Sequence, residues 1–217
     1  MNNKVELIGT YGSDKTHALS AWTSTNRELT VDKQNRIASL LDMLAKEGHH
    51  SVFEKSSIHF LVTTDIATHI HLLKHRIGVS INTESARYKE LKDDKFYVPY
   101  DWDEEERAIY IATLENSFKL YHEAYNRLLA KGFSKKRAKE SARLYIPYGS
   151  QLVADVMFNF RSFYHFLQLR YSKHAQREVS NLAKDMLIQV QNTHKFDKTL
   201  CAFGLVDKDG NLVEEFA

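Results

Sequence analysis

Prolines and glycines are scarce in this chain, and their scarcity limits the folds open to it more than any other feature. Two prolines and eight glycines are spread over 217 residues. Because these residue types interrupt regular structure most effectively, long stretches without them favour long helices. The spacing of the apolar residues then predicts where those helices and the few strands lie.

Helical periodicity recurs along the chain. Helices are predicted over six segments, at residues 30–49, 66–76, 101–132, 135–146, 161–170 and 172–191. Five of the six segments have a polar residue suited to the N-cap at or just before their start, namely Thr30 or Asp32, Asp65, Asp101 or Asp103, Ser134, and, for the last helix, Ser172. Gly48 and Gly132 stand where helix C-terminal glycines belong.

Strand signals are fewer. Residues 4–11 form a short strand candidate, and in residues 56–64 the apolar side chains Ile58, Phe60 and Val62 alternate with polar ones. Residues 151–160 alternate in the same way, although a helix is not excluded there, and an Asp-Gly pair in residues 205–216 indicates a small hairpin. The predicted fold is α+β, a helix-dominated single domain over residues 1–217 with a small central sheet.

Charge and composition limit the function. The net charge is +2, whereas a protein that binds nucleic acid by electrostatic attraction usually has a larger basic excess. One cysteine, Cys201, excludes an internal disulfide. The N-terminus has no signal-peptide pattern, and no apolar run approaches the roughly 20 residues needed to cross a bilayer. We therefore expect a cytoplasmic protein that binds neither membrane nor nucleic acid.

The segment "KHRIGVSINTESARY", residues 74–88, follows a predicted helix and shows neither helical nor strand periodicity. We expect a loop that carries cationic and hydroxyl side chains. Arginines recur elsewhere in segments rich in buried-type residues, and a buried arginine needs a partner. The arginines concerned are Arg76, Arg87, Arg143, and Arg161 or Arg170. A phosphate or a protein carboxylate could each be the partner of such an arginine. From the residues alone we predict an anion-binding site and favour phosphate as the anion.

Two other chemistries fit the residues less well. His71 and His75 have the spacing of a zinc-binding helix, with His69 nearby, but "HLLKH" lacks the glutamate of the HExxH motif, so we expect no metal. Neither Ser80 nor Ser85 lies in a GxSxG elbow. We expect these serines to donate hydrogen bonds to a ligand rather than to act as nucleophiles.

Four segments, in order, resemble the flavin-dependent thymidylate synthase family. Residues 74–88 resemble its Arg-His-Arg, seven-residue gap, Ser and Arg-Tyr signature, with Lys74 in place of the first arginine and one extra residue between Arg76 and Ser85. The other three segments are "GHHSVFE" at 48–54, "ESARLYIP" at 140–147 and "NFRSFYHFLQLRYSKHAQREV" at 159–179. The resemblance spans roughly residues 48–190 and leaves the tail from about residue 195 uncovered.

The resemblance implies a fold like that of the thymidylate synthase complementing proteins, with a small antiparallel sheet. It also implies reductive methylation of dUMP to dTMP, with 5,10-methylenetetrahydrofolate as carbon donor and NADPH-reduced FAD as hydride source. No protein nucleophile takes part. The family forms homotetramers with active sites between subunits. Catalysis would come from positioning and charge stabilisation, while the cofactors perform the transfers.

The resemblance also implies residue roles. The residues expected to bind FAD are His49, Ser51, Lys74, His75, Arg76, Thr83, Asn159, Arg161 and His165. Those expected to bind dUMP are His71, Glu84, Ser85, Ala86 through its backbone amide, Arg87, Arg143 and Arg170. Arg170 is the expected catalytic residue, because its charge would stabilise negative charge on the uracil ring.

The extra residue between Arg76 and Ser85 leaves one register open. The family's loop glutamate aligns with Thr83 if the register is kept from Ser85, but Glu84 is adjacent. Two alternative functions also stay open. One is methyl or hydroxymethyl transfer to another pyrimidine nucleotide on the same scaffold, and the other is non-enzymatic binding of a nucleotide or RNA.

Overall fold

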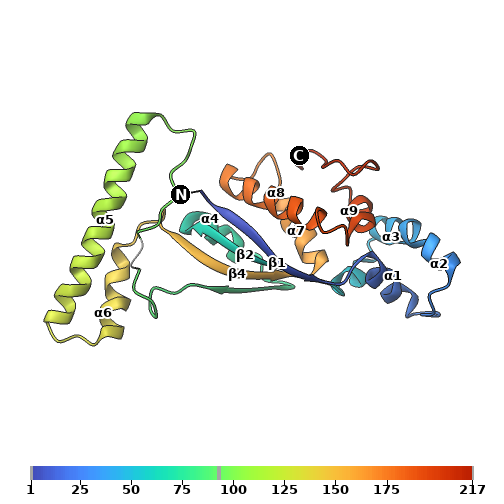
Figure 1. Cartoon of the computed structure of the whole chain (residues 1–217), viewed down its shortest axis with the longest axis horizontal. Coiled ribbons are helices and arrows are strands. Elements are labelled where there is room, and N and C mark those ends of the chain that lie inside the picture. Colours follow the sequence, from blue (N-terminus) through green and yellow to red (C-terminus); the bar gives the residue numbers. More distant parts are fainter. Residues whose placement is uncertain (1, 92–93, 217) are drawn as a thin grey trace. The chain divides into compact units, whose positions relative to one another are not determined.

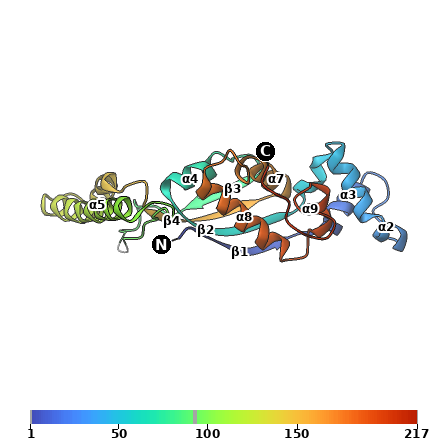
Figure 2. The same ribbon diagram turned by 90° about the horizontal axis from the view of Figure 1, so that it is seen from above.

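The fold is known from a computed structural model that describes residues 2–91 and 94–216. Four strands form one antiparallel sheet in the order β1-β2-β4-β3. They are β1 (Lys4–Tyr11), β2 (Ser57–Asp65), β3 (Val79–Thr83) and β4 (Gln151–Phe158). Figures 1 and 2 show these strands among a larger number of helices. The predicted helix-dominated α+β class with a small antiparallel sheet is confirmed.

The helices fall largely where the periodicity predicts them. The described α-helices are α1 (Asp14–Trp22), α2 (Val31–Asn35), α3 (Ile37–Lys46), α4 (Ile66–Leu73), α5 (Glu104–Ala130), α6 (Lys135–Ala142), α7 (Phe160–Arg170), α8 (Arg177–Gln191) and α9 (Asp197–Ala202). Two 3-10 turns, η1 (His50–Glu54) and η2 (Arg143–Tyr145), follow α3 and α6. None of these helices has the length and apolar character needed to span a membrane.

Side-chain caps explain several helix starts. Thr30 accepts a hydrogen bond from the backbone N–H of Lys33, and Asp103 and Ser134 accept the equivalent bonds at α5 and α6. Asp65 Oδ1 accepts from the N–H of Thr68 at 2.8 Å and so caps α4 directly after β2. Each of these residues was a predicted N-cap.

Three local predictions were wrong. Ser172 does not cap α8, which begins five residues later at Arg177, because Ser172 instead forms a bridge to Phe216. The expected continuous helix over 30–49 is divided at Arg36 into α2 and α3. Part of the expected loop in residues 74–88 is strand β3, whose residues alternate between half-buried and exposed. Pairing with β4 supplies hydrogen bonds that a search for apolar periodicity does not detect.

Contacts within the chain divide it into two compact units. The first contains residues 1–4, 62–73 and 82–154, and the second contains residues 5–61, 74–81 and 155–217. In the first unit, α5 and α6 pack together through Tyr121, Ala124, Tyr125, Ala138 and Ala142. This apolar seam holds α6 against the longest helix.

The second unit has an aromatic core between its sheet strands and α7. The Phe60 ring lies 6.3 Å from that of Phe158 and 5.8 Å from that of Phe163, and Phe158 lies 5.3 Å from Phe166 (centroid distances). All four side chains are buried. Burial of such rings is the main stabilising term for a sheet covered by a helix.

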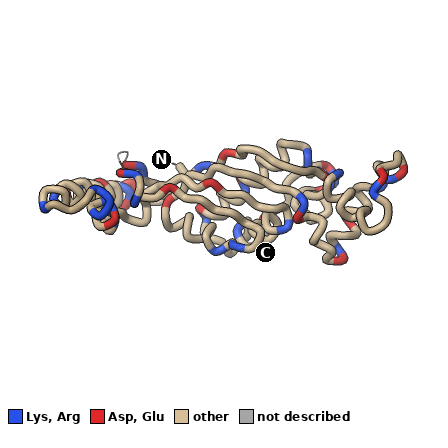
Figure 3. Tube along the Cα trace, turned by 90° about the horizontal axis from the view of Figure 1, so that it is seen from below, with Lys and Arg blue, Asp and Glu red and all other residues tan. Residues whose placement is uncertain are grey.

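Charged residues of both signs occur along the whole described trace (Figure 3). The net charge of +2 is therefore the sum of interspersed acidic and basic groups. Any cationic site must be built locally from a few side chains.

Candidate functional site

The cationic triplet of residues 74–76 lies just past α4, which ends at Leu73. Lys74 and Arg76 are exposed, whereas His75 is buried. The His75 ring packs edge-on against Phe166 at 5.0 Å and lies 6.2 Å from the ring of His165. The buried imidazole therefore packs against α7.

Arg170, the last residue of α7, forms a hydrogen bond with His75. Its Nε donates a hydrogen bond to His75 Nε2 at a distance of 3.0 Å. Burial lowers the pKa of the Arg170 guanidinium from its usual value, because desolvation disfavours the charged form. Since His75 Nε2 accepts from a cation, the lone pair on that nitrogen must be free of a proton.

The backbone at Ile77 and Gly78 rests on the first turn of α7. Gly78 O accepts from the N–H of Asn159 at 3.1 Å, and Ile77 O accepts from Ser162 Oγ at 2.7 Å. Asn159 caps α7 by accepting from the N–H of Ser162 at 2.8 Å. Gly78 has φ +66°, and a Cβ there would lie 2.2 Å from Ser162 Oγ. Only glycine fits at this crossing point, where the backbone of residues 77–78 passes the first turn of α7.

A pocket of about 670 Å³ opens beside this crossing point, within the second unit. Three of its lining residues, Asn159, Arg161 and His165, were predicted from sequence. Others that line it are His50, Glu54, Tyr164, Gln168 and Phe203. The pocket thus combines aromatic rings with cationic and amide groups, which is the usual character of a cofactor pocket.

The 3-10 turn η1 contributes differently from the prediction. His49 and Ser51 are exposed, and the members of this segment that line the pocket are His50 and Glu54. Glu54 is the last residue of the motif "GHHSVFE", so the motif could have been used to predict Glu54 as a site residue. His50 could not be predicted in this way, because its position in the pocket depends on packing against the distant residue Phe203.

Arg161 forms an ion pair with Glu54, another lining residue of this pocket. Its Nη1 lies 2.6 Å from Glu54 Oε1, and both side chains are partly exposed. An exposed pair of this kind contributes little to stability, so a stronger anion could displace the carboxylate.

The first unit holds the segment that follows β3. Glu84 N–H donates to Val153 O at 2.8 Å, and the chain then turns so that Ser85 O accepts from the N–H groups of Tyr88 and Lys89. Ser85 Oγ accepts from the N–H of Arg87 at 3.3 Å. Ser85, Ala86 and Arg87 therefore share one tight turn.

Arg87 has a carboxylate partner in this structure. Its Nε and Nη2 both donate to Glu140 Oε1 of α6, at 3.2 and 3.0 Å. The hydrogen bond from Arg87 is the main cause that lowers the pKa of the Glu140 carboxyl. Arg143 follows Glu140 by one turn and is exposed at the start of η2.

Thr83 and Glu84 have different polar partners. Thr83 Oγ1 lies 3.1 Å from Nε2 of the buried His69, and Glu84 Oε1 lies 2.6 Å from Lys89 Nζ. Burial also lowers the pKa of His69. His71, the predicted dUMP contact, is half-buried on α4. Among residues 2–91 and 94–216, no group of three or more His, Cys, Asp or Glu side chains is arranged to hold a metal ion.

The structure thus gathers the predicted residues into two sets. Asn159, Arg161 and His165 line one pocket, close to the bonded pair His75 and Arg170. In the other unit, residues 83–87 form a strand end and a turn beside Glu140.

Comparison with known proteins extends these observations. A family model described as thymidylate synthase complementing protein matches residues 6–194. A flavin-dependent thymidylate synthase from Pseudothermotoga lettingae is 32% identical over 186 residues, which cover 82% of this chain and 80% of the relative. Another with that name, from Streptomyces avermitilis, is 30% identical over 187 residues, covering 76% and 74%. Among solved structures, a UMP/dUMP methylase from Streptomyces cacaoi bound with 5-Br dUMP has a TM-score of 0.78 and 29% identity, with 93% of this chain and 94% of that chain covered.

Proposed function

Because the chain belongs to the family of thymidylate synthase complementing proteins, we propose that it is a flavin-dependent thymidylate synthase that converts dUMP to dTMP. The observation that carries this proposal is the pocket beside Gly78, where three family-type residues, Asn159, Arg161 and His165, come together. Neither the arginines alone nor the pocket alone would identify the reaction.

The pocket has the features that a flavin dinucleotide requires. At about 670 Å³ it lies within the usual range for cofactor pockets, roughly 300–1,000 Å³. The rings of Tyr164 and Phe203 offer apolar faces to a planar ring system. Arg161 offers a guanidinium to a pyrophosphate once the carboxylate of Glu54 is displaced. When bound there, FAD supplies the hydride chemistry of the reaction.

The turn formed by Ser85, Ala86 and Arg87 is suited to the phosphate of dUMP. Arg87 already places two N–H donors against one carboxylate oxygen, and a phosphate offers more acceptors in the same geometry. Arg143 would add a second cation from the end of α6. His71 and either Thr83 or Glu84 complete the proposed nucleotide contacts.

Arg170 is the proposed catalytic residue. Its partly desolvated guanidinium, held at Nε by His75, keeps its two terminal nitrogens for the uracil ring. Fixed donors of this kind stabilise charge that develops on a substrate without needing to reorganise. Ser85 accepts a backbone hydrogen bond from Arg87, which suits a role in binding rather than in nucleophilic attack.

The finer features of the reaction are part of the proposal. NADPH is the reductant, 5,10-methylenetetrahydrofolate is the carbon donor, and the working form is a cytoplasmic homotetramer with active sites between subunits. Lys74, Arg76, His49 and Ser51 are exposed in the chain described here, which is compatible with contacts made in such an assembly.

One experiment tests the reaction directly. The purified chain should bind FAD and form dTMP from dUMP, methylenetetrahydrofolate and NADPH, and activity should disappear when FAD is removed. A chain that binds no FAD, or forms dTMP without it, would overturn the proposal. Light scattering of the loaded protein measures the assembly separately.

A second candidate function has its own observation. The structural neighbour from Streptomyces cacaoi is described as a UMP/dUMP methylase, and this chain has one residue more than the family signature between Arg76 and Ser85. Methylation of UMP on the same scaffold is therefore the alternative. Mass analysis of products from dUMP and UMP, supplied separately, distinguishes the two. Oligonucleotide binding with a steep salt dependence would instead favour the nucleic-acid alternative.

A further inference from the structure

The C-terminal segment after residue 194 lies beyond the family match, yet part of it lines the pocket described above. From this we propose that α9 and Phe203 form a wall of the flavin pocket, so that Ala202 and Phe203 are cofactor-contacting residues. This inference rests on the proposed function, since it assumes that the pocket takes FAD.

Aromatic rings pack around Phe203 at the pocket. Phe203 has its ring centroid 4.5 Å from Tyr164 and 5.2 Å from His50, and all three residues line the pocket. Phe53 lies behind Phe203 at 4.7 Å in an edge-to-face arrangement. The pocket therefore has an aromatic wall built from η1, α7 and the C-terminal segment. Such a wall suits a planar heteroaromatic ring better than a flexible chain.

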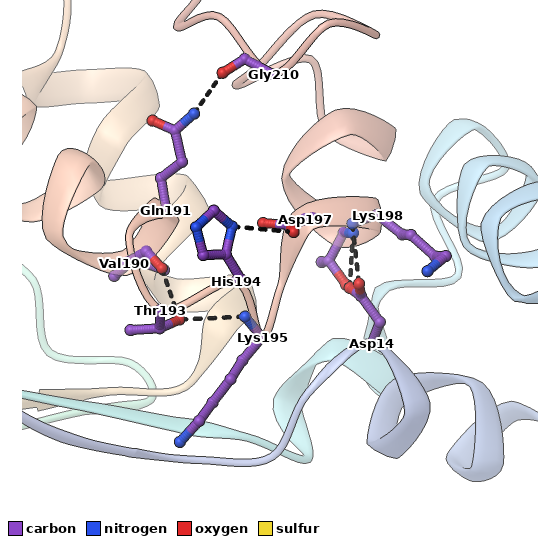
Figure 4. Close-up of polar contacts among 10 residues, drawn as sticks. Asp14, Val190, Gln191, Thr193, His194, Lys195, Asp197, Lys198 and Gly210 are labelled. Atoms are coloured by element: carbon purple, nitrogen blue, oxygen red, sulfur yellow. Dashed lines mark hydrogen bonds and ion pairs between the residues drawn. The ribbon is translucent and has the colours of Figure 1, made fainter.

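Hydrogen bonds to Asp14, the first residue of α1, fix the start of α9. Asp14 Oδ2 accepts from the N–H of Lys198 at 2.9 Å, while Oδ1 accepts from the N–H and the hydroxyl of Thr199 at 2.8 and 2.7 Å. Figure 4 shows the Asp14 carboxylate facing the backbone at Lys198. A carboxylate at this position satisfies backbone donors that the first turn of a helix leaves without partners.

A buried histidine links the same helix to the segment around η1. His17 lies 3.0 Å from Thr199 Oγ1 through Nδ1 and 2.9 Å from Ser56 Oγ through Nε2. His17 and Thr199 are fully buried, and Ser56 is nearly so. Because Ser56 follows Glu54 by two residues, this link holds two walls of the pocket at a fixed separation.

The residues before α9 are held as well. His194 is the one non-glycine residue with positive φ in the described part of the chain, at +54°, and its Nδ1 lies 3.4 Å from Asp197 Oδ2 (Figure 4). Thr193 Oγ1 accepts from the N–H of Lys195 at 3.3 Å in the same turn. These contacts hold the turn between α8 and α9, and the far end of α9 supplies the pocket residues Ala202 and Phe203.

Two adjacent residues allow a matched test. Ala202 lines both the proposed flavin pocket and a second cavity, whereas its neighbour Cys201 lines the second cavity and is not among the residues that line the flavin pocket. Ala202→Leu adds bulk inside the flavin pocket and should weaken FAD binding by roughly tenfold or more. Cys201→Leu introduces the same side chain one position away and should leave FAD affinity within about twofold. Both affinities are measured by quenching of flavin fluorescence, and thermal unfolding confirms that both variants fold.

Phe203→Leu provides a second measurement. It keeps an apolar side chain but removes the ring, and FAD affinity should fall about three- to tenfold with the loss of ring stacking. Comparing FMN with ADP as ligands then identifies the ring that lies on this wall, since only one of the two should lose affinity.

The outcomes separate this inference from the proposed function. If the unmodified chain binds no FAD, the proposed function fails. If it binds FAD and Ala202→Leu binds equally well while folded, the inference about the C-terminal wall fails and the function stands. Equal losses in Ala202→Leu and Cys201→Leu would also overturn the inference, because they would indicate a general disturbance of α9.

Discussion

Arg170 Nε donates a hydrogen bond to Nε2 of the buried His75, across a distance of 3.0 Å. The two residues are 95 positions apart in the chain and come together because α7 places Arg170 beside the segment that follows α4. The bond uses Nε, which lies on one edge of the guanidinium.

Replacing Arg170 by lysine should reduce kcat with little change in the KM for dUMP. Lysine retains a positive charge but lacks the planar fork, so it cannot bond His75 and face the uracil ring at the same time. We expect kcat to fall about 100- to 1,000-fold, as when one charge-stabilising donor is lost. Arg36→Lys, at an exposed pair with Asp32, is the control and should leave kcat unchanged. Unchanged kcat in Arg170→Lys would remove this residue from the catalytic role.

Arg87→Ala should raise the KM for dUMP by about ten- to hundredfold, because a charged hydrogen-bond donor to the phosphate is lost. Steady-state kinetics at varied dUMP measures this effect. Arg137→Ala is the matched control, since Arg137 also faces Glu140, at 3.8 Å, but is not a proposed ligand. If both variants raise KM equally, the effect belongs to the environment of Glu140 and not to phosphate binding.

Gly78→Ala should destabilise the chain more than Gly48→Ala does. Both glycines have φ near +70°, at +66° and +71°, so both alanine variants carry the strain of a left-handed conformation, roughly 1–2 kcal/mol. A Cβ at Gly78 would also clash with Ser162 and Asn159, whereas nothing lies within 4 Å at Gly48. We expect a further loss of about 1–3 kcal/mol for Gly78→Ala in denaturant unfolding, together with weaker FAD binding. Equal losses would mean that the contact with α7 is not a tight one.

The free energy of unfolding should fall as the pH is lowered from about 6.5 toward 4. Burial lowers the pKa of His17 from 6.5 to about 4, so between these values the unfolded chain binds a proton that the folded chain excludes. The unfolded state gains stability from that proton, and the folded state loses roughly 3 kcal/mol relative to it by pH 4. Burial raises the pKa of the Asp14 carboxyl, so the folded chain binds this proton more tightly than the unfolded chain does. Protonation of Asp14 therefore opposes the loss of stability as the pH falls.

Two histidine variants test the source of this pH dependence. His17→Gln removes the titrating group and should flatten the slope between pH 6.5 and 4 in urea unfolding. His174→Gln, at an exposed position, is the matched control and should keep the slope of the unmodified chain. A slope that survives in His17→Gln would assign the effect to other groups.

Much of the fold could be predicted because its causes are local. Asp65 caps α4 from the adjacent position, and the alternation of Ile58, Phe60 and Val62 matches the buried face of β2. The small hairpin near the C-terminus also has a local cause, since Asp207 N–H donates to Asn211 O across the Asp-Gly turn. In each case the interacting residues are within a few positions of one another.

The candidate site could be predicted in part. Arg161 and Asn159 were recognised through a motif and do line the pocket. Glu54 belonged to another motif, yet its pairing with Arg161 joins residues 107 positions apart. No single segment contains that information.

Sequence by itself determined the class of fold, most of its helix starts and the family to which the chain belongs. Tertiary structure alone decided that residues 79–83 form an edge strand, that Ser172 does not cap α8, and that Phe203 lies on the pocket wall. The physical reason is the range of the interactions. Caps and apolar periodicity act within one or two turns, whereas strand pairing and ring packing depend on partners that only the folded chain brings together.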